Sequence, residues 1–336
     1  MASIKRKLIF YHFWIKELFR FCPYRKSNID KDHLFLTCGH RGSPVNEPEN
    51  TIPSLERALS EGANALEVDI CVTKDNEVIL WHDWNPDGFV ALIRENGLEP
   101  EVKYKPYFPA PFSGFRNKTS ELTLQDFRKY YNYVKKGENQ PAGAHIPILA
   151  EFIQWISDTE KVKYVFLDVK VPKDEKELVM LILDQLGALV REFNPSCQFI
   201  IETSSKEVLN TAKNKYPDLI YCLDVELPPG FVFFPRLHSG IKAAIQNNNS
   251  VGLILRPSKI TFGNWMTYRR VMRYDVRKRN RFNKKNPDQQ INFLIGCTIN
   301  SKKEMDCLIK KGINGIQTDY PRRLTNIVKE FGLKRE

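Results

Sequence analysis

The chain has 336 residues, 42% of them hydrophobic, a length that suits one large core or two modest ones. Its formal net charge of +11 predicts an anionic partner such as a phosphate group or an acidic membrane surface. A nucleic-acid partner is disfavoured, because the sequence contains no recognisable nucleic-acid-binding module. The seven cysteines have no C-x-x-C spacing, which favours reduced thiols in an intracellular protein and argues against zinc.

Residues 1–30 are predicted to form a helical extension that begins basic and then turns aromatic. The apolar run 8–21 is too short and too charged for a transmembrane helix, and it lacks the small-residue cleavage site of a signal peptide. Two alternatives stay open: the extension packs on the body of the protein, or it lies in a membrane interface with its basic side toward the headgroups. We expect a cytoplasmic protein, with peripheral membrane contact as the alternative.

The remaining residues, 31–336, show eight short apolar runs, each followed by a helix or by a segment that contains one. The expected strands cover 34–39, 65–73, 163–170, 197–203, 218–226, 251–257, 291–300 and 314–320. This alternation predicts an α/β fold with a parallel sheet, and eight units predict closure into a (β/α)8 TIM barrel. An open doubly wound sheet would place a glycine-rich phosphate loop after its first strand, where this chain has HRGSPVNEPENT.

Two features extend the barrel pattern after its second strand. Residues 77–83 predict an extra strand, turned back by KDN (74–76) in a β-hairpin. Residues 84–150 form a long insertion, in which 122–134 predicts a helix and 146–149 leads as an extended segment into the next helix. Excursions of this length usually carry function.

Three carboxylates are expected at the C-terminal ends of neighbouring strands, where barrels carry their chemistry. Glu67 and Asp69 are two positions apart on one strand, so both point into the barrel mouth, and Asp168 repeats the arrangement on the next strand. Clustered carboxylates resist burial without a cation, and oxygen ligands suit Mg²⁺ or Ca²⁺. The alternative is that Arg41 and Lys170 neutralise the carboxylates without metal.

Two histidines stand beside these acids, His40 at the end of the first strand and His82 at the end of the hairpin. Next to a cation they are candidates for general acid and general base. Arg41 and Lys170 are candidates for binding an anionic phosphate group. Together these residues predict a phosphoester site.

The loop after the first strand supplies further candidates. We expect Gly39 to let the backbone turn at the barrel rim, and Asn50 or Thr51 to cap the first helix. Glu49 and Asn50 are candidate supporting residues, and Glu49 is expected to orient the site through Arg41 or the metal.

The order and spacing of these motifs resemble the glycerophosphodiester phosphodiesterase family. The matching stretches are HRG (40–42), PENT (48–51), GANALEVDICVTKDNEVILWHD (62–83), IPIL-AE (146–151), FLDVK (166–170), CTIN (297–300) and NGIQTDYP (314–321). The resemblance implies a metal-dependent TIM-barrel hydrolase that releases glycerol 3-phosphate and an alcohol from glycerophosphodiesters, through attack by the substrate's own 2-hydroxyl and a cyclic phosphate. It implies that His40 and His82 are the acid and base. The metal ligands that it implies are Glu67, Asp69 and Asp168.

The chain departs from the family pattern in the expected pocket wall. Asp168 stands where the family usually has Glu, and Cys297 where it usually has Trp. The usual Ser-Phe pair after the fourth strand is Thr203-Ser204 here. These changes bear on the identity of the substrate more than on catalysis.

The leaving alcohol stays open. Two aromatic loops, 104–115 and 227–237, are expected at the barrel mouth, where they either form a lid over a small soluble diester or contact a membrane. With 1–21 and the basic helix 267–285, they make lysophospholipase D-type hydrolysis of lysophospholipids an alternative function. The helix 267–285 has nine Arg and Lys against one Asp. The alternative to an anionic partner is that this helix is a solvated basic surface helix. A non-catalytic, phospholipid-binding barrel is a further alternative.

Overall fold

The computed structural model describes residues 32–99, 101–227, 238–255 and 265–335. The predicted extension 1–30 and almost all of the predicted aromatic loop 227–237 lie outside the described residues. The division of the chain into 1–30 and 31–336 therefore stays a prediction.

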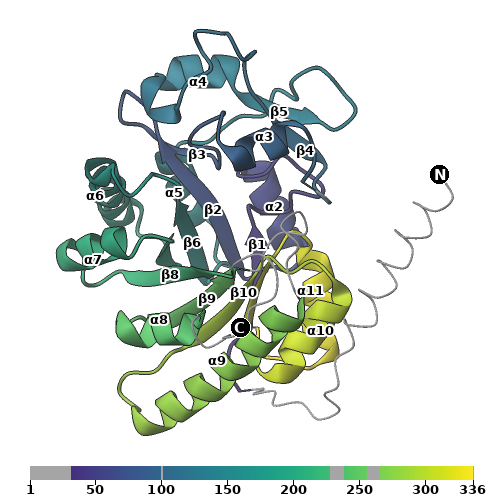
Figure 1. Ribbon diagram of the computed structural model, residues 1–336, viewed down its shortest axis with the longest axis vertical. Helices are drawn as coiled ribbons and strands as arrows, with labels where there is room; N and C mark the ends of the chain where they lie inside the picture. The colour runs from purple at the N-terminus through teal and green to yellow at the C-terminus, as the bar shows by residue number, and fades with distance from the viewer. Residues whose placement is uncertain (1–31, 100, 228–237, 256–264, 336) are drawn as a thin grey trace, which may run out of the picture.

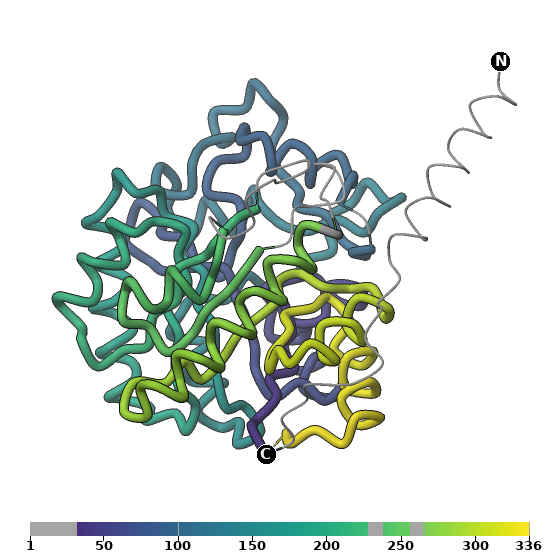
Figure 2. Tube along the Cα trace, turned by 60° about the horizontal axis from the view of Figure 1, so that its bottom comes forward, coloured from purple at the N-terminus to yellow at the C-terminus, as the bar shows by residue number. Residues whose placement is uncertain are grey.

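The described residues contain eight parallel strands that close into a barrel (Figure 1). The strands are β1 (Leu36–His40), β2 (Ala65–Val72), β6 (Tyr164–Val169), β7 (Gln198–Thr203), β8 (Ile220–Glu226), β9 (Val251–Leu255), β10 (Phe293–Cys297) and β11 (Gly315–Thr318). Closure occurs because β1 pairs in parallel with both β2 and β11. Figure 2 shows the consequence: the purple start of the described chain lies beside its yellow C-terminal part. The predicted (β/α)8 fold is confirmed.

Helices follow the strands and cover the outside of the barrel (Figure 1). They are α2 (Ile52–Ser60), α5 (Leu149–Ser157), α6 (Lys176–Phe193), α7 (Lys206–Lys215), α8 (Gly240–Gln246), α9 (Trp265–Lys285), α10 (Lys302–Lys311) and α11 (Pro321–Glu330). Within the described part of the chain, no helix combines the length and the apolar character that crossing a bilayer requires.

The predicted basic helix is α9, which is amphipathic. Tyr268, Met272 and Val276 recur at the i, i+4 spacing and are buried against the barrel. Arg270 and Arg277 are exposed on the opposite face. The helix thus has the solvated basic face that the sequence predicted, and an anionic partner for it stays a prediction.

Alternation along the strands sorts side chains into two buried layers. On β2, Leu66, Val68 and Ile70 belong to the core between strands and helices. Ala65, from the same strand, packs with Phe166 of β6 in a separate cluster inside the barrel. Glu67 and Asp69 have the same parity as Ala65, so they face the interior as predicted.

The hairpin and the insertion follow β2. β3 (Val78–Leu80) pairs with β2 in antiparallel fashion, which confirms the hairpin. The insertion contains α3 (Phe89–Glu95), β4 (Tyr104–Tyr107), the 3-10 helix η1 (Thr119–Glu121), α4 (Leu124–Tyr130) and β5 (Asn132–Lys135). The predicted helix 122–134 is wrong at its end, because 132–134 belongs to β5 and pairs with β4. Tyr and Val side chains suit a strand, and tertiary pairing decides between the two structures.

Aromatic packing joins the insertion to the barrel. Trp81, directly after β3, has ring centroids of Phe127 and Tyr133 within 5.3 and 4.9 Å. Phe108 lies 6.2 Å from the same ring. The insertion therefore shares a hydrophobic core with the barrel.

The cysteines only partly match the expectation of reduced thiols. Among the described residues, the free thiols are those of Cys38, Cys71, Cys197, Cys222 and Cys297, and all five are buried. Cys307 on α10 is disulfide-bonded, so the prediction is wrong at that position. Spacing along a sequence could not show this, since pairing depends on which cysteines the fold brings together.

Candidate active site

Two glycines let the loop after β1 approach α2. Gly42 has a φ of 89°, and a Cβ there would lie 2.5 Å from Oγ of Ser54. Only glycine fits such a position. At Gly39 the φ is not left-handed, and a Cβ would meet Cβ of Ala58 at 2.8 Å. Gly39 therefore permits close packing on α2, which corrects the expectation that it turns the backbone.

Thr51 and Asn50 have different structural roles in the same loop. Thr51 caps α2, since its Oγ1 accepts a hydrogen bond from the backbone N–H of Ser54. Asn50 instead holds Asp69. Its Nδ2 donates to Oδ2 of Asp69 at 2.8 Å, and its Oδ1 accepts from the backbone N–H of Asp69 at 3.0 Å.

The three predicted metal ligands meet at the C-terminal end of the barrel strands. Ligand oxygens of Glu67, Asp69 and Asp168 all lie within 4.8 Å of one another. The register of β2 and β6 places Asp69 directly opposite Asp168. Because every donor is a carboxylate oxygen, the set fits a hard cation such as Mg²⁺ or Ca²⁺.

Arg41 and Lys170 both reach this trio. Nε of Arg41 lies 2.9 Å from Oδ2 of Asp69, and Nζ of Lys170 lies 3.1 Å from Oδ1 of Asp69 and also pairs with Asp168. Burial raises the pKa of Asp69, but Arg41 and Lys170 together hold it well below its usual value. Glu67, in contrast, has no Arg or Lys side chain as an ion-pair partner among the described residues. Neutralisation by the two cations is therefore incomplete.

His40 is held at the end of β1 by a carboxylate from the other end of the chain. Its Nδ1 lies 2.7 Å from Oδ1 of Asp319, and its Nε2 lies 3.9 Å from Oε2 of Glu67. Burial and Arg41 lower the pKa of His40, but Glu67 and Asp319 outweigh them and raise it above its usual value. The ring is thus fixed with Nε2 toward the trio.

His82 has a matching arrangement after β3. Its Nδ1 lies 2.7 Å from Oδ1 of Asp83. Burial, Arg41 and Arg94 lower the pKa of His82 below its usual value, against the opposing effect of Asp83 and other acids. The two histidines therefore have pKa values displaced in opposite directions.

Arg94 on α3 is a residue that sequence reasoning missed. It is buried, and its guanidinium donates to Asp83 at 2.5 Å and to Glu99 at 3.0 Å, and also pairs with Glu49. Glu49 in turn accepts from Arg41 at 3.0 Å, so the predicted contact between these two is present. No sequence motif marks Arg94, because its partners become neighbours only when the insertion folds back on the site.

Glu202 of β7 and Asp224 of β8 were also missed. Their ligand oxygens and one of Asp168 lie within 4.8 Å of one another. The alternation that located Glu67 could have found them, since Glu202 has the parity of the interior residue Ile200. Burial, followed by repulsion from neighbouring carboxylates, raises the pKa of both well above the usual range.

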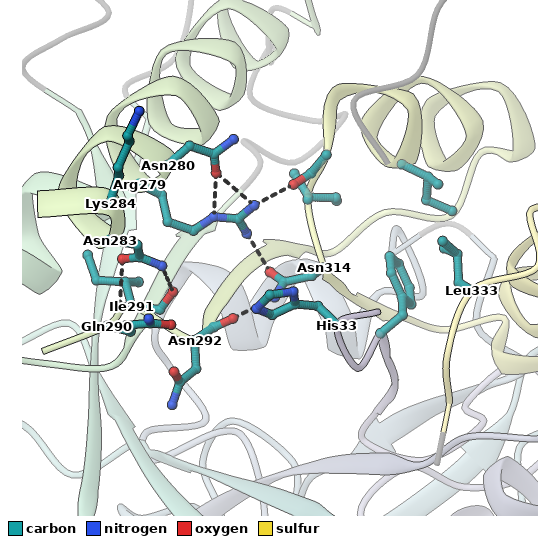
Figure 3. Close-up of a pocket in the computed structure, with 14 residues that line it drawn as sticks. His33, Arg279, Asn280, Asn283, Lys284, Gln290, Ile291, Asn292, Asn314 and Leu333 are labelled. Atoms are coloured by element: carbon teal, nitrogen blue, oxygen red, sulfur yellow. Dashed lines mark hydrogen bonds between the residues drawn. The ribbon is translucent and has the colours of Figure 1, made fainter. Parts of the chain in front are cut away.

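A cavity of about 330 Å³ lies at the opposite end of the barrel, before β1, β10 and β11 (Figure 3). Its residues bond mainly to each other: the guanidinium of Arg279 donates to Oδ1 of Asn314 at 2.8 Å and to the carbonyl of Gly312 at 2.9 Å. No carboxylate is among its lining residues. The N-terminal face of a barrel usually serves stability, and the candidate chemistry is at the other face.

Comparison with known proteins identifies the family. The model of the "Glycerophosphoryl diester phosphodiesterase family" matches residues 40–323. The chain is 46% identical over 293 residues to a glycerophosphodiester phosphodiesterase of Bacillus altitudinis, covering 87% of this chain and 97% of that protein. It is 26% identical over 308 residues to one of Caldanaerobacter subterraneus subsp. tengcongensis, covering 88% and 99%.

The fold is also similar to a solved Oleispira antarctica phosphodiesterase in complex with the product sn-glycerol-3-phosphate. The TM-score is 0.58 at 17% identity, covering 87% of this chain and 96% of that one. The resemblance inferred from the sequence motifs is confirmed by the family match. The chain therefore belongs to the glycerophosphoryl diester phosphodiesterase family and is a phosphoric diester hydrolase of that family.

Proposed function

We propose that the protein hydrolyses glycerophosphodiesters to glycerol 3-phosphate and an alcohol, in a site that binds Mg²⁺ or Ca²⁺. The observation that carries the proposal is the convergence of two carboxylate-held histidines and three oxygen ligands at one end of the barrel. The ligands would be Glu67, Asp69 and Asp168. A cation bound there would offset the carboxylate charge and polarise a phosphoryl oxygen. The product complex of the Oleispira relative supports the substrate class.

His40 and His82 are the proposed acid and base. Each ring has its Nδ1 held by a carboxylate, so each can exchange a proton at Nε2. One histidine takes the proton of the substrate's 2-hydroxyl while the oxygen of that hydroxyl attacks phosphorus. The other protonates the leaving oxygen as the P–O bond to the alcohol breaks, which leaves a cyclic phosphate. Water then opens this ring with the proton transfers reversed. The internal nucleophile makes the first step intramolecular.

We propose that Arg41 and Lys170 bind the phosphate. Both are already at the wall of the carboxylate trio, and both offer N–H donors suited to phosphate oxygens. Glu49 and Asn50 would support the site, since Glu49 pairs with Arg41 and Asn50 holds Asp69 through two hydrogen bonds.

A glycerophosphocholine assay with and without EDTA tests the proposal. We expect release of glycerol 3-phosphate that stops in EDTA and returns with Mg²⁺ or Ca²⁺. His40→Ala and His82→Ala should each lower kcat by at least about 10²-fold, while the circular dichroism spectrum stays native. His145→Ala is the matched control, because this exposed ring bonds to Glu151 outside the site. Full activity in EDTA would refute the metal, and near-normal rates in either variant would refute the acid–base scheme.

A second candidate function is hydrolysis of lysophospholipids at a membrane surface. In that case we propose that the protein is cytoplasmic and contacts the membrane peripherally. The insertion exposes apolar side chains: Phe89 is 72% exposed, Leu98 63% and Phe112 fully. Large apolar side chains that are exposed in this way are available for contact with lipid. Within the predicted loop 104–115, however, Phe108 is buried in the aromatic core.

The non-catalytic barrel is not retained, because a relative at 46% identity is named an enzyme.

Vesicle assays separate the two substrates. If the second candidate is correct, lysophosphatidylcholine in vesicles is hydrolysed, and the double variant Phe89→Ser/Phe112→Ser loses most of that activity while keeping its activity on glycerophosphocholine. Good turnover of glycerophosphocholine without turnover of lysophosphatidylcholine would exclude it.

A further inference from the structure

A second set of carboxylates continues the first around the inside of the barrel. Ligand oxygens of Asp168, Glu202 and Asp224 lie within 4.8 Å of one another, and Asp168 belongs to both sets. The register of β6 and β7 places Glu202 directly opposite Asp168. We infer that Asp168, Glu202 and Asp224 form a second divalent-cation site that shares Asp168 with the first. The inference rests on the proposed function for the first site.

An unpartnered oxygen supports this site independently of the clustering. Asp224 is 9% exposed, and its Oδ1 is buried with no hydrogen-bond partner. Burying a carboxylate oxygen without a partner is costly, so a ligand that supplies positive charge fits this position. Glu202 accepts from Nε2 of Gln317 at 3.0 Å, and this neutral amide supplies no positive charge.

The balance of charge also favours a second cation. Five interior carboxylates face two side-chain cations; the carboxylates are Glu67, Asp69, Asp168, Glu202 and Asp224, and the cations are Arg41 and Lys170. If all five carboxylates are ionised, one divalent ion leaves this group negative, so that it repels an anionic phosphodiester, whereas two divalent ions make it positive. The rival explanation is that protons neutralise Glu202 and Asp224.

The spacing of the oxygens suits a metal ion. Ca²⁺ binds oxygens at about 2.3–2.6 Å, so ligands on opposite sides of one ion are about 5 Å apart. Two ions that share a carboxylate can stabilise both the attacking and the leaving oxygen of a phosphoryl transfer. The second site would therefore act on the same reaction as the first.

Counting bound Mn²⁺ tests the inference. Equilibrium dialysis of the full chain at saturating Mn²⁺ should give two ions per chain, and electron paramagnetic resonance should show a coupled pair. The double variant Glu202→Gln/Asp224→Asn should bind one ion and lose the coupling. The control Asp184→Asn, which removes an exposed carboxylate paired with Lys215, should keep both ions.

One ion per wild-type chain at saturation would overturn the inference, and so would two ions in a folded double variant. The wild-type count decides the question even where the variant does not fold. Failure of the proposed function is distinguishable, because glycerophosphocholine is then not hydrolysed at all. If only the second site fails, EDTA-sensitive hydrolysis persists with a single ion.

Discussion

Asp319 and Asp83 each bind a histidine Nδ1, and each is itself held in place. Asp319 accepts from Nδ2 of Asn300 at 2.5 Å, and its backbone N–H donates to Oδ1 of the same residue at 3.0 Å. Asp83 accepts from Arg94. In the proposed mechanism these carboxylates are positioning residues, because each one orients the ring of its histidine.

Replacing Asp319 tests positioning without removing His40. In Asp319→Asn the pKa of His40 should fall, since Asp319 is one of the groups that raise it. We expect kcat on glycerophosphocholine to drop about 10- to 100-fold, the scale seen when the hydrogen-bond partner of a metal-bound histidine is removed. NMR titration of His40 measures the pKa. The control Asp306→Asn removes a partly exposed carboxylate of α10 that pairs with Lys310, and it should change neither quantity. An unchanged His40 pKa in Asp319→Asn would show that the contact has no influence.

At the scale of elements, a buried carboxylate joins two helices. Asp275 of α9 is fully buried. Its carboxylate accepts hydrogen bonds from Oγ of Ser239 at 2.5 Å and from the backbone N–H of Ile241 at 3.2 Å. Ser239 is the N-cap of α8, so Asp275 ties α9 to the start of α8. Burial raises the pKa of Asp275 to about 6 despite these hydrogen bonds.

This shift predicts a stability loss at rising pH. Between about pH 4 and pH 6 the unfolded chain has already released the Asp275 proton while the folded chain retains it, so rising pH favours unfolding. Relative to Asp275→Asn, wild-type stability should fall by up to about 3 kcal/mol across this window. Urea unfolding at pH 4, 5, 6 and 7 measures both proteins. Parallel pH profiles would contradict the shift.

Elements that follow a simple period were predictable from the sequence, and those that depend on distant partners were not. Alternation identified β2 and placed Glu67 and Asp69 inside the barrel. The same alternation also places Glu202 inside the barrel, but no sequence motif around this Glu marks it as a site residue. Arg94 had no signal, because Asp83 and Glu49 reach it only in the folded chain. The sequence did not predict the strand 132–135 for the same reason, since its partner β4 lies in an irregular insertion.

For the whole molecule, the barrel is what assembles the site. The proposed ligands come from β2, β6, β7 and β8, and the histidines from β1 and the segment after β3. An unfolded chain cannot bring these groups together. Cation binding should therefore be linked to folding.

This linkage predicts a metal-dependent unfolding temperature. Ca²⁺ or Mg²⁺ at 100 times its Kd should stabilise the folded state by about 2.7 kcal/mol for one site. Asp69→Asn should lose most of the resulting rise in Tm, and the exposed control Asp184→Asn should keep it. Differential scanning calorimetry of the full chain with EDTA or with each ion measures the change. A wild-type Tm that ignores both ions would argue against a metal site.

The contact between His40 and Asp319 also sets an order of events during synthesis. The two residues are 279 positions apart, and they join only after β1 pairs with β11. At about 5–20 residues per second, the ribosome needs roughly 15–60 s to supply Asp319 after His40. Until then one edge of β1 has no partner, and contacts of such long range slow folding. A growing chain therefore cannot hydrolyse substrate with a properly held His40, and activity begins only with the complete barrel.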